Sequence, residues 1–249
     1  MLRFDMSSIQ GVIHLKKPFI ILLDYMRLQL LCLLWKTEPE RILIIGLGAG
    51  ILPKMFHYLS PNTLIDVVEI DIEIMNLAQK YFDFNQNDRI RVYIEDGRHF
   101  IERQPSNQYD VIIIDAFTVK NHVPHRLHTI ECVSEYLRIL KSTGLVIGNF
   151  FYEQESRYRQ TYERAFFKQI YQGVIKNNYI LIGLNKQTKV FNQNELQLRA
   201  RDLQQNKSLF DMNWIHETKH IHNENNDKWN RSTRIFTDKI YENSLDLLE

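Results

Sequence analysis

The stretch from Arg41 to Asp71, RILIIGLGAGILPKMFHYLSPNTLIDVVEID, constrains the fold of this chain more than any other part of it. It predicts a buried strand over 42–45, a glycine turn, a helix, and a second strand that ends at Glu69. A continuous apolar run bounded by glycines is typical of a parallel strand covered on both faces. Three glycines permit a tight turn and let backbone N–H groups approach a ligand closely: Gly46, Gly48 and Gly50. Because Glu69 can accept hydrogen bonds from ribose hydroxyls at the end of its strand, the stretch predicts a nucleoside pocket.

The spacing of these glycines distinguishes two kinds of nucleotide site. The dinucleotide pattern has glycine at the first, third and sixth positions of the turn. Counted from Gly46, the sixth position is Ile51, and the third glycine falls at the fifth position. This G-x-G-x-G form resembles the class I S-adenosylmethionine-dependent methyltransferase fold, whose ligand brings no pyrophosphate to the helix N-terminus.

The composition excludes several classes of protein. With 249 residues, 44% of them hydrophobic and 24% charged, the chain fits one globular domain of the larger sort. The net charge of +1 gives no reason to expect nucleic acid or an anionic membrane as a partner. The apolar run from Phe19 to Trp35 contains Asp24 and Arg27, and each charge costs about 2.5–3.5 kcal/mol near the centre of a bilayer. This run therefore predicts a largely buried helix. Two widely separated cysteines, Cys32 and Cys132, indicate a reducing compartment, so we expect a cytoplasmic protein.

The alternation of strand and helix patterns after residue 40 predicts βαβ units. The expected strands cover 42–45, 64–69, 90–94, 110–114 and 145–150, with helices over about 51–59, 72–82, 98–103 and 130–140 between them. A helix over about 156–167 leads to strands over 170–175 and 179–184, and the short turn between these two predicts a hairpin.

The predicted fold class is therefore α/β: a Rossmann-like, doubly wound, mostly parallel seven-stranded sheet with a terminal antiparallel hairpin and a short β/helical N-terminal arm. We expect three parts in the chain. Residues 1–40 form a short arm and helix, 41–185 form the S-adenosylmethionine-type domain, and 186–249 form a peripheral extension packed on that domain. Within the extension we expect a helix around 195–205 and loose segments near 222–231.

Ligands of open α/β sheets bind outside the carboxyl ends of the strands, and several candidate residues fall there. Besides the glycine turn and Glu69, they are Asp96 with Gly97 after the third strand, and Asp115 with Phe117 after the fourth. Asp96 can accept a hydrogen bond from an adenine amino group, although it can equally cap the helix that follows it. Asp115 is placed to face the reactive end of the ligand.

The same residues carry a family resemblance over 41–150. The pieces ILIIGLGAG, VVEID, EDGRHF and YDVIIIDAF resemble the spermidine synthase (polyamine aminopropyltransferase) family. The resemblance implies decarboxylated S-adenosylmethionine as donor, a polyamine or other small amine as acceptor, and a role in polyamine biosynthesis. By this match Glu69 holds the ribose, Asp96 and Gly97 hold the adenine, and Asp115 helps to deprotonate the attacking amine. The family also suggests a homodimer.

Two positions depart from the typical pattern of that family. Typical members read G-G-G-D-G at the turn, where the aspartate helps to hold the aminopropyl donor; this chain has Ala49 there. They also carry two acids on the loop after the fourth strand, and here the loop reads DAFTV. The chain is similar as well to eukaryotic lysine methyltransferases with a comparable glycine turn. Methyl transfer from S-adenosylmethionine to an amine, and a nucleoside-binding protein without catalysis, are the alternative functions.

The remaining candidates lie near the chain start and on the loop after Asp115. Tyr25 and Asp24 could close the pocket from the N-terminal helix, and Gln10 could reach the nucleoside from the arm. An aromatic side chain on an apolar helix also suits the core, and a glutamine also suits a strand edge. His122, His125 and His128 belong to a loop whose irregular histidine spacing is poor for a metal, so we expect no metal and a lid over the pocket.

Overall fold

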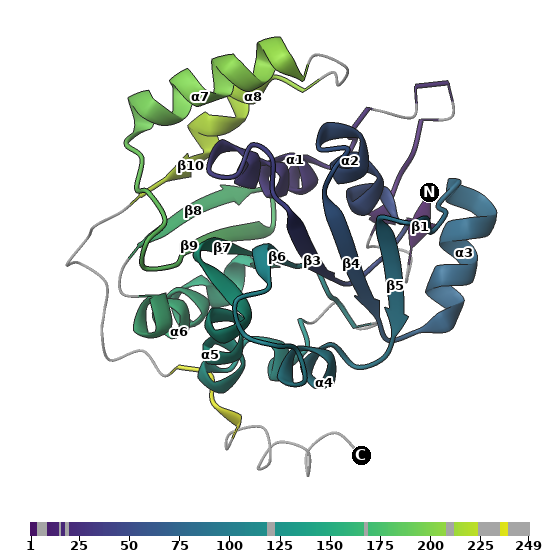
Figure 1. Cartoon of the computed structure of the whole chain (residues 1–249), viewed down its shortest axis with the longest axis horizontal. Helices are drawn as coiled ribbons and strands as arrows, with labels where there is room; N and C mark the ends of the chain where they lie inside the picture. Colours follow the sequence, from purple (N-terminus) through teal and green to yellow (C-terminus); the bar gives the residue numbers. More distant parts are fainter. Residues whose placement is uncertain are drawn as a thin grey trace.

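The main sheet has the strand order β10-β8-β9-β7-β6-β3-β4-β5 (Figure 1). This computed structural model describes residues 1–3, 9–14, 16–17, 20–118, 123–166, 169–207, 212–223 and 235–238. The strands are β3 (Arg41–Ile45), β4 (Leu64–Glu69), β5 (Ile90–Ile94), β6 (Tyr109–Ile114), β7 (Leu140–Phe151), β8 (Ile170–Ile175), β9 (Asn178–Leu184) and β10 (Ile221–His222). Strands β3 to β7 pair in parallel, and β9 runs antiparallel to both β7 and β8. The predicted doubly wound sheet with its terminal hairpin is confirmed.

Helices cover both faces of the sheet (Figure 1). They are α1 (Asp24–Leu30), α2 (Ile51–Leu59), α3 (Ile72–Phe82), α4 (Gly97–Glu102), α5 (Ile130–Ile139), α6 (Glu155–Phe166), α7 (Gln193–Asn206) and α8 (Trp214–Glu217), with short 3₁₀ helices η1 (Leu31–Leu34), η2 (His125–Leu127), η3 (Tyr152–Gln154) and η4 (Thr218–His220). One core lies between the sheet and α1, α2, α3 and α7, and the other between the sheet and α4, α5 and α6. Every residue of β6 is buried, as the apolar strand pattern predicts.

Two expectations about element boundaries were wrong. The helix expected over 19–35 is split, because α1 begins at Asp24 and passes into the tighter η1 at Leu31. The sheet has an eighth strand, β10, which is short and pairs antiparallel with β8. Of the segment 222–231 that was expected to be loose, only 222–223 are among the described residues. The edge strand β8 offers unpaired backbone groups that the two residues of β10 satisfy.

The N-terminal arm forms a small sheet of its own. Strand β1 (Leu2–Arg3) pairs antiparallel with β2 (Ile9–Gly11). The arm is therefore β-structured, as expected, although the two strands pair with each other and are not part of the main sheet.

The C-terminal segment 235–238 packs against the face covered by α5 and α6. The ring of Phe236 is 2% exposed and lies 4.4 Å from the ring of His128 and 5.0 Å from that of Tyr158, between centroids. The Asp238 carboxylate accepts a hydrogen bond from the Thr129 hydroxyl at 2.7 Å and pairs with Arg98 at 3.3 Å. His125 also contacts the Phe236 ring. The histidines at 125 and 128 thus pack into an aromatic cluster, and His122 lies outside the described residues.

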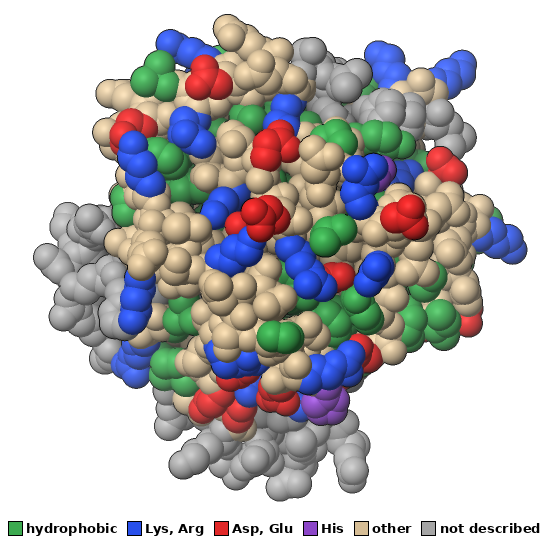
Figure 2. Space-filling view, viewed as in Figure 1, with side chains coloured by type: hydrophobic (Ala, Val, Ile, Leu, Met, Phe, Trp, Pro, Cys, Tyr) green, Lys and Arg blue, Asp and Glu red, His purple; other side chains and the backbone are tan. Residues whose placement is uncertain are grey.

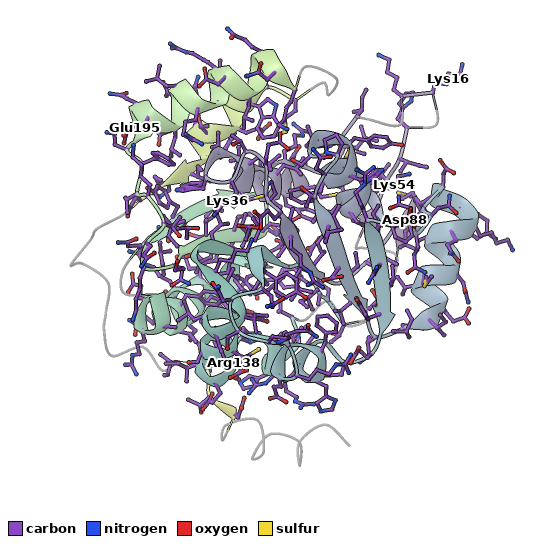
Figure 3. All side chains as sticks on the ribbon, viewed as in Figure 1. Lys16, Lys36, Lys54, Asp88, Arg138 and Glu195 are labelled. Carbon is purple, nitrogen blue, oxygen red and sulfur yellow. The ribbon has the colours of Figure 1, made fainter. Side chains whose placement is uncertain are left out.

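Ionic contacts fasten the elements at the periphery. At the amino end of β6, Asp110 accepts hydrogen bonds from the backbone of Glu40 and Arg41 and pairs with Lys36, which Figure 3 labels. The guanidinium of Arg138, also labelled there, donates to backbone carbonyls at the end of α4 and so joins α4 to α5. These contacts lie away from the carboxyl edge of the sheet.

The surface shows no dominant charge of one sign. Figure 2 shows positive and negative side chains interspersed over the face in view, in keeping with the net charge of +1. In the ranges that the structure describes, none of the helices combines the length and the apolar character needed to span a bilayer.

Candidate functional site

The carboxyl ends of β3, β4, β5 and β6 meet at one edge of the sheet and bring four loops together. Backbone bonds fix their relative positions: the Gly46 N–H donates to the Val68 carbonyl at 2.8 Å, and the Asp115 N–H donates to the Ile45 carbonyl at 2.9 Å. The Glu95 N–H donates to the Glu69 carbonyl at 2.9 Å in the same way. The glycine turn, Glu69, Asp96 with Gly97, and Asp115 with Phe117 therefore lie along one edge, as the sequence predicts.

The glycine turn has a backbone that only glycine adopts readily. Gly46, Gly48 and Gly50 have φ values of 99°, 54° and 68°. A Cβ atom added to Gly46 would lie 2.3 Å from the carbonyl oxygen of Asp115, so a side chain there would separate β3 from β6. The turn then leads into α2, whose first residue follows Gly50. Free N–H groups at this helix start form an electropositive end that suits an anionic or polar ligand group.

Glu69 braces the turn from the neighbouring strand. Its Oε2 accepts a hydrogen bond from the Leu47 N–H at 2.9 Å, and its Oε1 accepts one from the Asp71 N–H at 3.1 Å. The residue is 9% exposed. Since a carboxylate can accept about four hydrogen bonds, two acceptor sites remain for a ligand's hydroxyl groups.

Asp96 is the N-cap of α4. Its Oδ1 accepts a hydrogen bond from the His99 N–H at 3.0 Å, so the helix-cap role expected as an alternative is present. Gly97 follows at the first position of that helix, where an added Cβ would lie 2.9 Å from a side-chain carbon of Ile45. This close approach brings the start of α4 onto the end of β3, and the second Asp96 oxygen has no assigned partner in the described structure.

Asp115 lies in a partly buried position after β6 and is held by an amide. Oδ1 accepts a hydrogen bond from Nδ2 of Asn149 on β7 at 2.9 Å. Removal from water raises the pKa of Asp115 to about 6, and the Asn149 hydrogen bond opposes this by favouring the charged form. A carboxylate with this pKa is ionised at neutral pH and is a stronger base than an ordinary aspartate.

Two residues of α1, Tyr25 and Gln29, lie near Asp115. Burial, together with the negative charge of Asp115, raises the pKa of Tyr25 well above its usual value, so its hydroxyl stays protonated. The Gln29 side chain is fully buried near Asp115, and neither of its amide atoms has a hydrogen-bond partner in the described structure. Because a buried amide without a partner is costly, Gln29 is a candidate to bind a ligand group beside Asp115.

Asp24 is already engaged by cations of this chain. Its Oδ1 pairs with Arg27 at 2.8 Å and its Oδ2 with Lys176, on the turn between β8 and β9, at 2.7 Å. The carboxylate expected to help close the pocket therefore already pairs with two cations of this chain.

Phe117 contributes an aromatic wall. Its ring lies 5.3 Å from that of Phe151 between centroids, in an edge-to-face arrangement. Both side chains are half-buried, so the pair presents an apolar surface beside Asp115.

The arm strand β2 covers the glycine turn at Ala49. A Cβ atom added to Gly11 would lie 2.3 Å from the Cβ of Ala49, which is itself 1% exposed. The position where typical family members carry an acid is thus closed by the backbone of Gly11. Gln10 is the preceding residue of β2; the conformation of its side chain is outside the described part of the structure.

Sequence reasoning missed the buried amides. Asn149 and Gln29 lie in otherwise apolar stretches, LVIGNFF and LQLLCLL, and a polar residue isolated in a core element is the signal that could have identified them. Asn178, which donates to Asn149 at 2.9 Å, begins β9 and carries no such signal. No group of three or more histidine, cysteine or acidic side chains within the described ranges is arranged to hold a metal ion.

Comparison with known proteins gives the family. The model of the spermine/spermidine synthase domain matches residues 27–182. A polyamine aminopropyltransferase of Vibrio vulnificus is 35% identical over 193 residues, which cover 74% of this chain and 62% of that protein. An eEF1A lysine and N-terminal methyltransferase of Bos taurus is 41% identical over 114 residues, 44% of this chain and 14% of that protein. The chain thus spans less than two thirds of the length of these relatives.

Solved structures share the fold. A probable spermidine synthase from Corynebacterium glutamicum has a TM-score of 0.65 at 23% identity, over 76% of this chain and 73% of that one. Human methyltransferase-like protein 13, solved in complex with SAH, has a TM-score of 0.61 at 24% identity, over 83% and 93%. With the family model matching more than half of its residues, the chain belongs to the spermine/spermidine synthase family, a family of transferases.

Proposed function

We propose that the protein transfers an aminopropyl group from decarboxylated S-adenosylmethionine to an amine acceptor. The observation that carries the proposal is Asp115, a partly buried carboxylate with a pKa of about 6 at the same edge as the glycine turn and Glu69. An amine arrives protonated at neutral pH and needs a base before it can attack. The V. vulnificus relative, named a polyamine aminopropyltransferase, supports the aminopropyl group.

The proposed step needs no metal. Asp115 accepts a proton from the acceptor ammonium, and the freed nitrogen lone pair attacks the carbon bound to the sulfonium. The carbon–sulfur bond breaks, and its electron pair stays on sulfur to give neutral methylthioadenosine. In the proposed pose, Glu69 holds the ribose, and Asp96 with Gly97 holds the adenine. Tyr25, Gln29 and Phe117 enclose the acceptor amine, and positioning with exclusion of water supplies most of the rate.

Methyl transfer from intact S-adenosylmethionine to an amine is the second candidate. The specific observation in its favour is Ala49, which stands where typical family members carry the acid that helps to hold the aminopropyl donor, and whose Cβ lies against the backbone of Gly11. The methyltransferase relatives from Bos taurus and other animals agree with this candidate. The attack and the role of Asp115 are the same, and the sulfur product is S-adenosylhomocysteine.

Calorimetric titration separates the candidates. S-adenosylmethionine, its decarboxylated form and methylthioadenosine are titrated separately into the purified protein at the same pH and ionic strength. Tighter binding of the decarboxylated donor, followed by formation of methylthioadenosine with a diamine, supports aminopropyl transfer. Tighter binding of the carboxylated donor overturns it in favour of methyl transfer. Binding without turnover of either donor indicates a nucleoside-binding protein. If none of the three ligands binds, the site is not a nucleoside pocket.

We further propose the wider setting of the protein. It acts in the cytoplasm on a small amine of polyamine biosynthesis, without nucleic acid or membrane as partner, and it assembles as a homodimer. Residues 1–40, 41–185 and 186–249 are proposed as arm, catalytic domain and peripheral extension. The packing of α7 against η1, where Arg199 donates to the Leu34 carbonyl, supports that placement of the extension.

A further inference from the structure

Two asparagines connect Asp115 to the turn between β8 and β9. Nδ2 of Asn149 donates to Oδ1 of Asp115 at 2.9 Å, and Nδ2 of Asn178 donates to Oδ1 of Asn149 at 2.9 Å. Asn149 is 1% exposed, so water does not compete for its amide. The paired register of β7 and β9, with Phe151 opposite Asn178, places the two asparagines on adjacent strands.

The hydrogen bond from Asn178 determines which atom of the Asn149 amide faces Asp115. An asparagine amide carries a donor nitrogen and an acceptor oxygen of nearly the same size, and either can face a neighbour. Because Asn178 donates to the oxygen of Asn149, the nitrogen of Asn149 is the atom turned toward Asp115. With an acceptor at position 178, the Asn149 amide would be expected to turn over and present its oxygen to the carboxylate, which repels it.

We propose that Asn149 and Asn178 are positioning residues for Asp115: Asn178 sets the direction of the Asn149 amide, and Asn149 holds the carboxylate ionised and aimed at the amine. The inference rests on the proposed function, in which Asp115 is the base. Neither asparagine is required to touch the reacting atoms. Their effect is on the geometry and ionisation of Asp115 alone.

Few other groups influence this carboxylate. From α1 it faces Tyr25, which stays neutral across the working pH range because its pKa is raised, and Gln29, an uncharged amide. From β7 it faces Asn149. On the same helix, Asp24 pairs with both Arg27 and Lys176, and none of these three charged groups is among the causes of the pKa shift of Asp115. A change in the titration of Asp115 after substitution of either asparagine therefore reports on the amide pair.

The test measures Asp115 directly. Carboxyl carbons of aspartate are labelled with carbon-13 and titrated by NMR, and the Asp115 signal is assigned by its absence from Asp115→Asn. Asn149→Leu removes the donor, so the pKa of Asp115 is expected to rise by about one unit or more, since a hydrogen bond to a charged group commonly changes an equilibrium tenfold to hundredfold. In parallel, the acid limb of the kcat/KM profile moves to higher pH by the same amount, with donor binding retained.

Substitutions of Asn178 test whether this residue sets the direction of the Asn149 amide. Asn178→Ala leaves the Asn149 amide free to turn and is expected to raise the pKa by less than Asn149→Leu does. Asn178→Asp turns the amide and raises the pKa further. Asn177→Asp is the control: it places the same charge on the exposed neighbouring residue of the turn, next to the residue that contacts Asn149. A shift for Asn178→Asp clearly larger than for Asn177→Asp supports the inference.

Two results overturn it. One is an Asp115 titration that stays within about 0.3 units in Asn149→Leu, well below the change expected from losing a charged hydrogen bond. The other is an equal shift in Asn178→Asp and Asn177→Asp, which would show a general charge effect. Because the titration needs no turnover, an inactive protein with either donor refutes the proposed function while the amide pair is still tested. Thermal unfolding of each variant identifies any that fail to fold.

Discussion

Ala49 lies directly beneath Gly11, so close that a Cβ atom added to Gly11 would be 2.3 Å from the Ala49 Cβ. The arm strand β2 therefore packs against the glycine turn. Restoring the acid typical of the family, Ala49→Asp, forces a larger side chain against this backbone. We expect it to lower the free energy of unfolding by about 1–3 kcal/mol, the usual cost of overpacking. Denaturant unfolding measures the loss.

The control for this substitution separates size from charge. Ala49→Asn has nearly the same volume as the aspartate and no charge. Similar destabilisation of both variants attributes the loss to crowding by Gly11. If Ala49→Asp is instead fully stable and binds the decarboxylated donor more tightly than wild type, then β2 moves aside readily and its position does not limit the donor.

Asp115→Asn is expected to separate turnover from nucleoside binding. Turnover is lost because the base is gone, while nucleoside affinity stays within about tenfold, or roughly 1.4 kcal/mol, because the nucleoside contacts lie elsewhere. Calorimetry and a product assay measure the two effects. Turnover that survives in Asp115→Asn would show that Asp115 is not the base.

The same substitution has a pH-dependent effect on stability. The pKa of Asp115 is raised in the folded state, so the stability it contributes is present below the unfolded pKa near 3.8 and is lost as pH rises through about 6. The Asp115→Asn variant has no carboxyl group at this position to ionise, so it does not lose this stability as pH rises. The amide oxygen of the new asparagine can still accept a hydrogen bond from Asn149. Its free energy of unfolding should match that of wild type near pH 3.5 and exceed it by up to about 3 kcal/mol near pH 8. A constant difference across this range contradicts the prediction.

Lys176→Ala is expected to change the preference between acceptors. It frees Oδ2 of Asp24, which then offers a carboxylate oxygen to the distal ammonium of a diamine. The KM for a diamine should fall about two- to fivefold, as the strength of exposed ion pairs suggests, with the KM for a monoamine unchanged. Lys189→Ala, which removes the exposed partner of Glu195, is the matched control. Equal changes for both amines would show that Asp24 does not meet the acceptor.

Because His128 is buried, we expect the folded protein to lose stability in acid. Burial lowers its pKa to about 3, and the nearby positive charge of Arg157 acts in the same direction. As pH falls below about 6.5, the unfolded chain gains a proton that the folded chain does not, so unfolding becomes more favourable. Between pH 6.5 and 4 the loss should approach about 3 kcal/mol.

Denaturant unfolding at several pH values measures this dependence. His128→Phe keeps an aromatic ring among Phe236 and Tyr158 without a titrating group. Its stability should depend less steeply on pH over the same interval. An unchanged slope in this variant would assign the acid sensitivity to other groups.

The parts of the site that could be predicted from the sequence depend on local patterns, and the parts that could not depend on contacts between residues far apart in the chain. The glycine turn, Glu69 and Asp96 follow strands whose patterns are local, and parallel pairing then brings their ends together without further information. Asn178 reaches Asp115 only through the register of β7 against β9, which no local pattern encodes. The engagement of Asp24 by Lys176 likewise depends on where the hairpin turn falls against α1. In both cases the decisive contact joins residues far apart in the chain.

The contact between Phe236 and the aromatic cluster has a consequence for synthesis of the protein. Thr129 and Asp238, which hydrogen-bond to each other, are 109 residues apart in sequence. A chain emerging from the ribosome presents the rings of His128 and Tyr158 long before the ring that covers them has been made. Since domains begin to fold during synthesis from the N-terminal end, the nascent protein passes through a stage with this apolar surface open. The surface is covered only when the segment that carries Phe236 has been synthesised and packs against these rings.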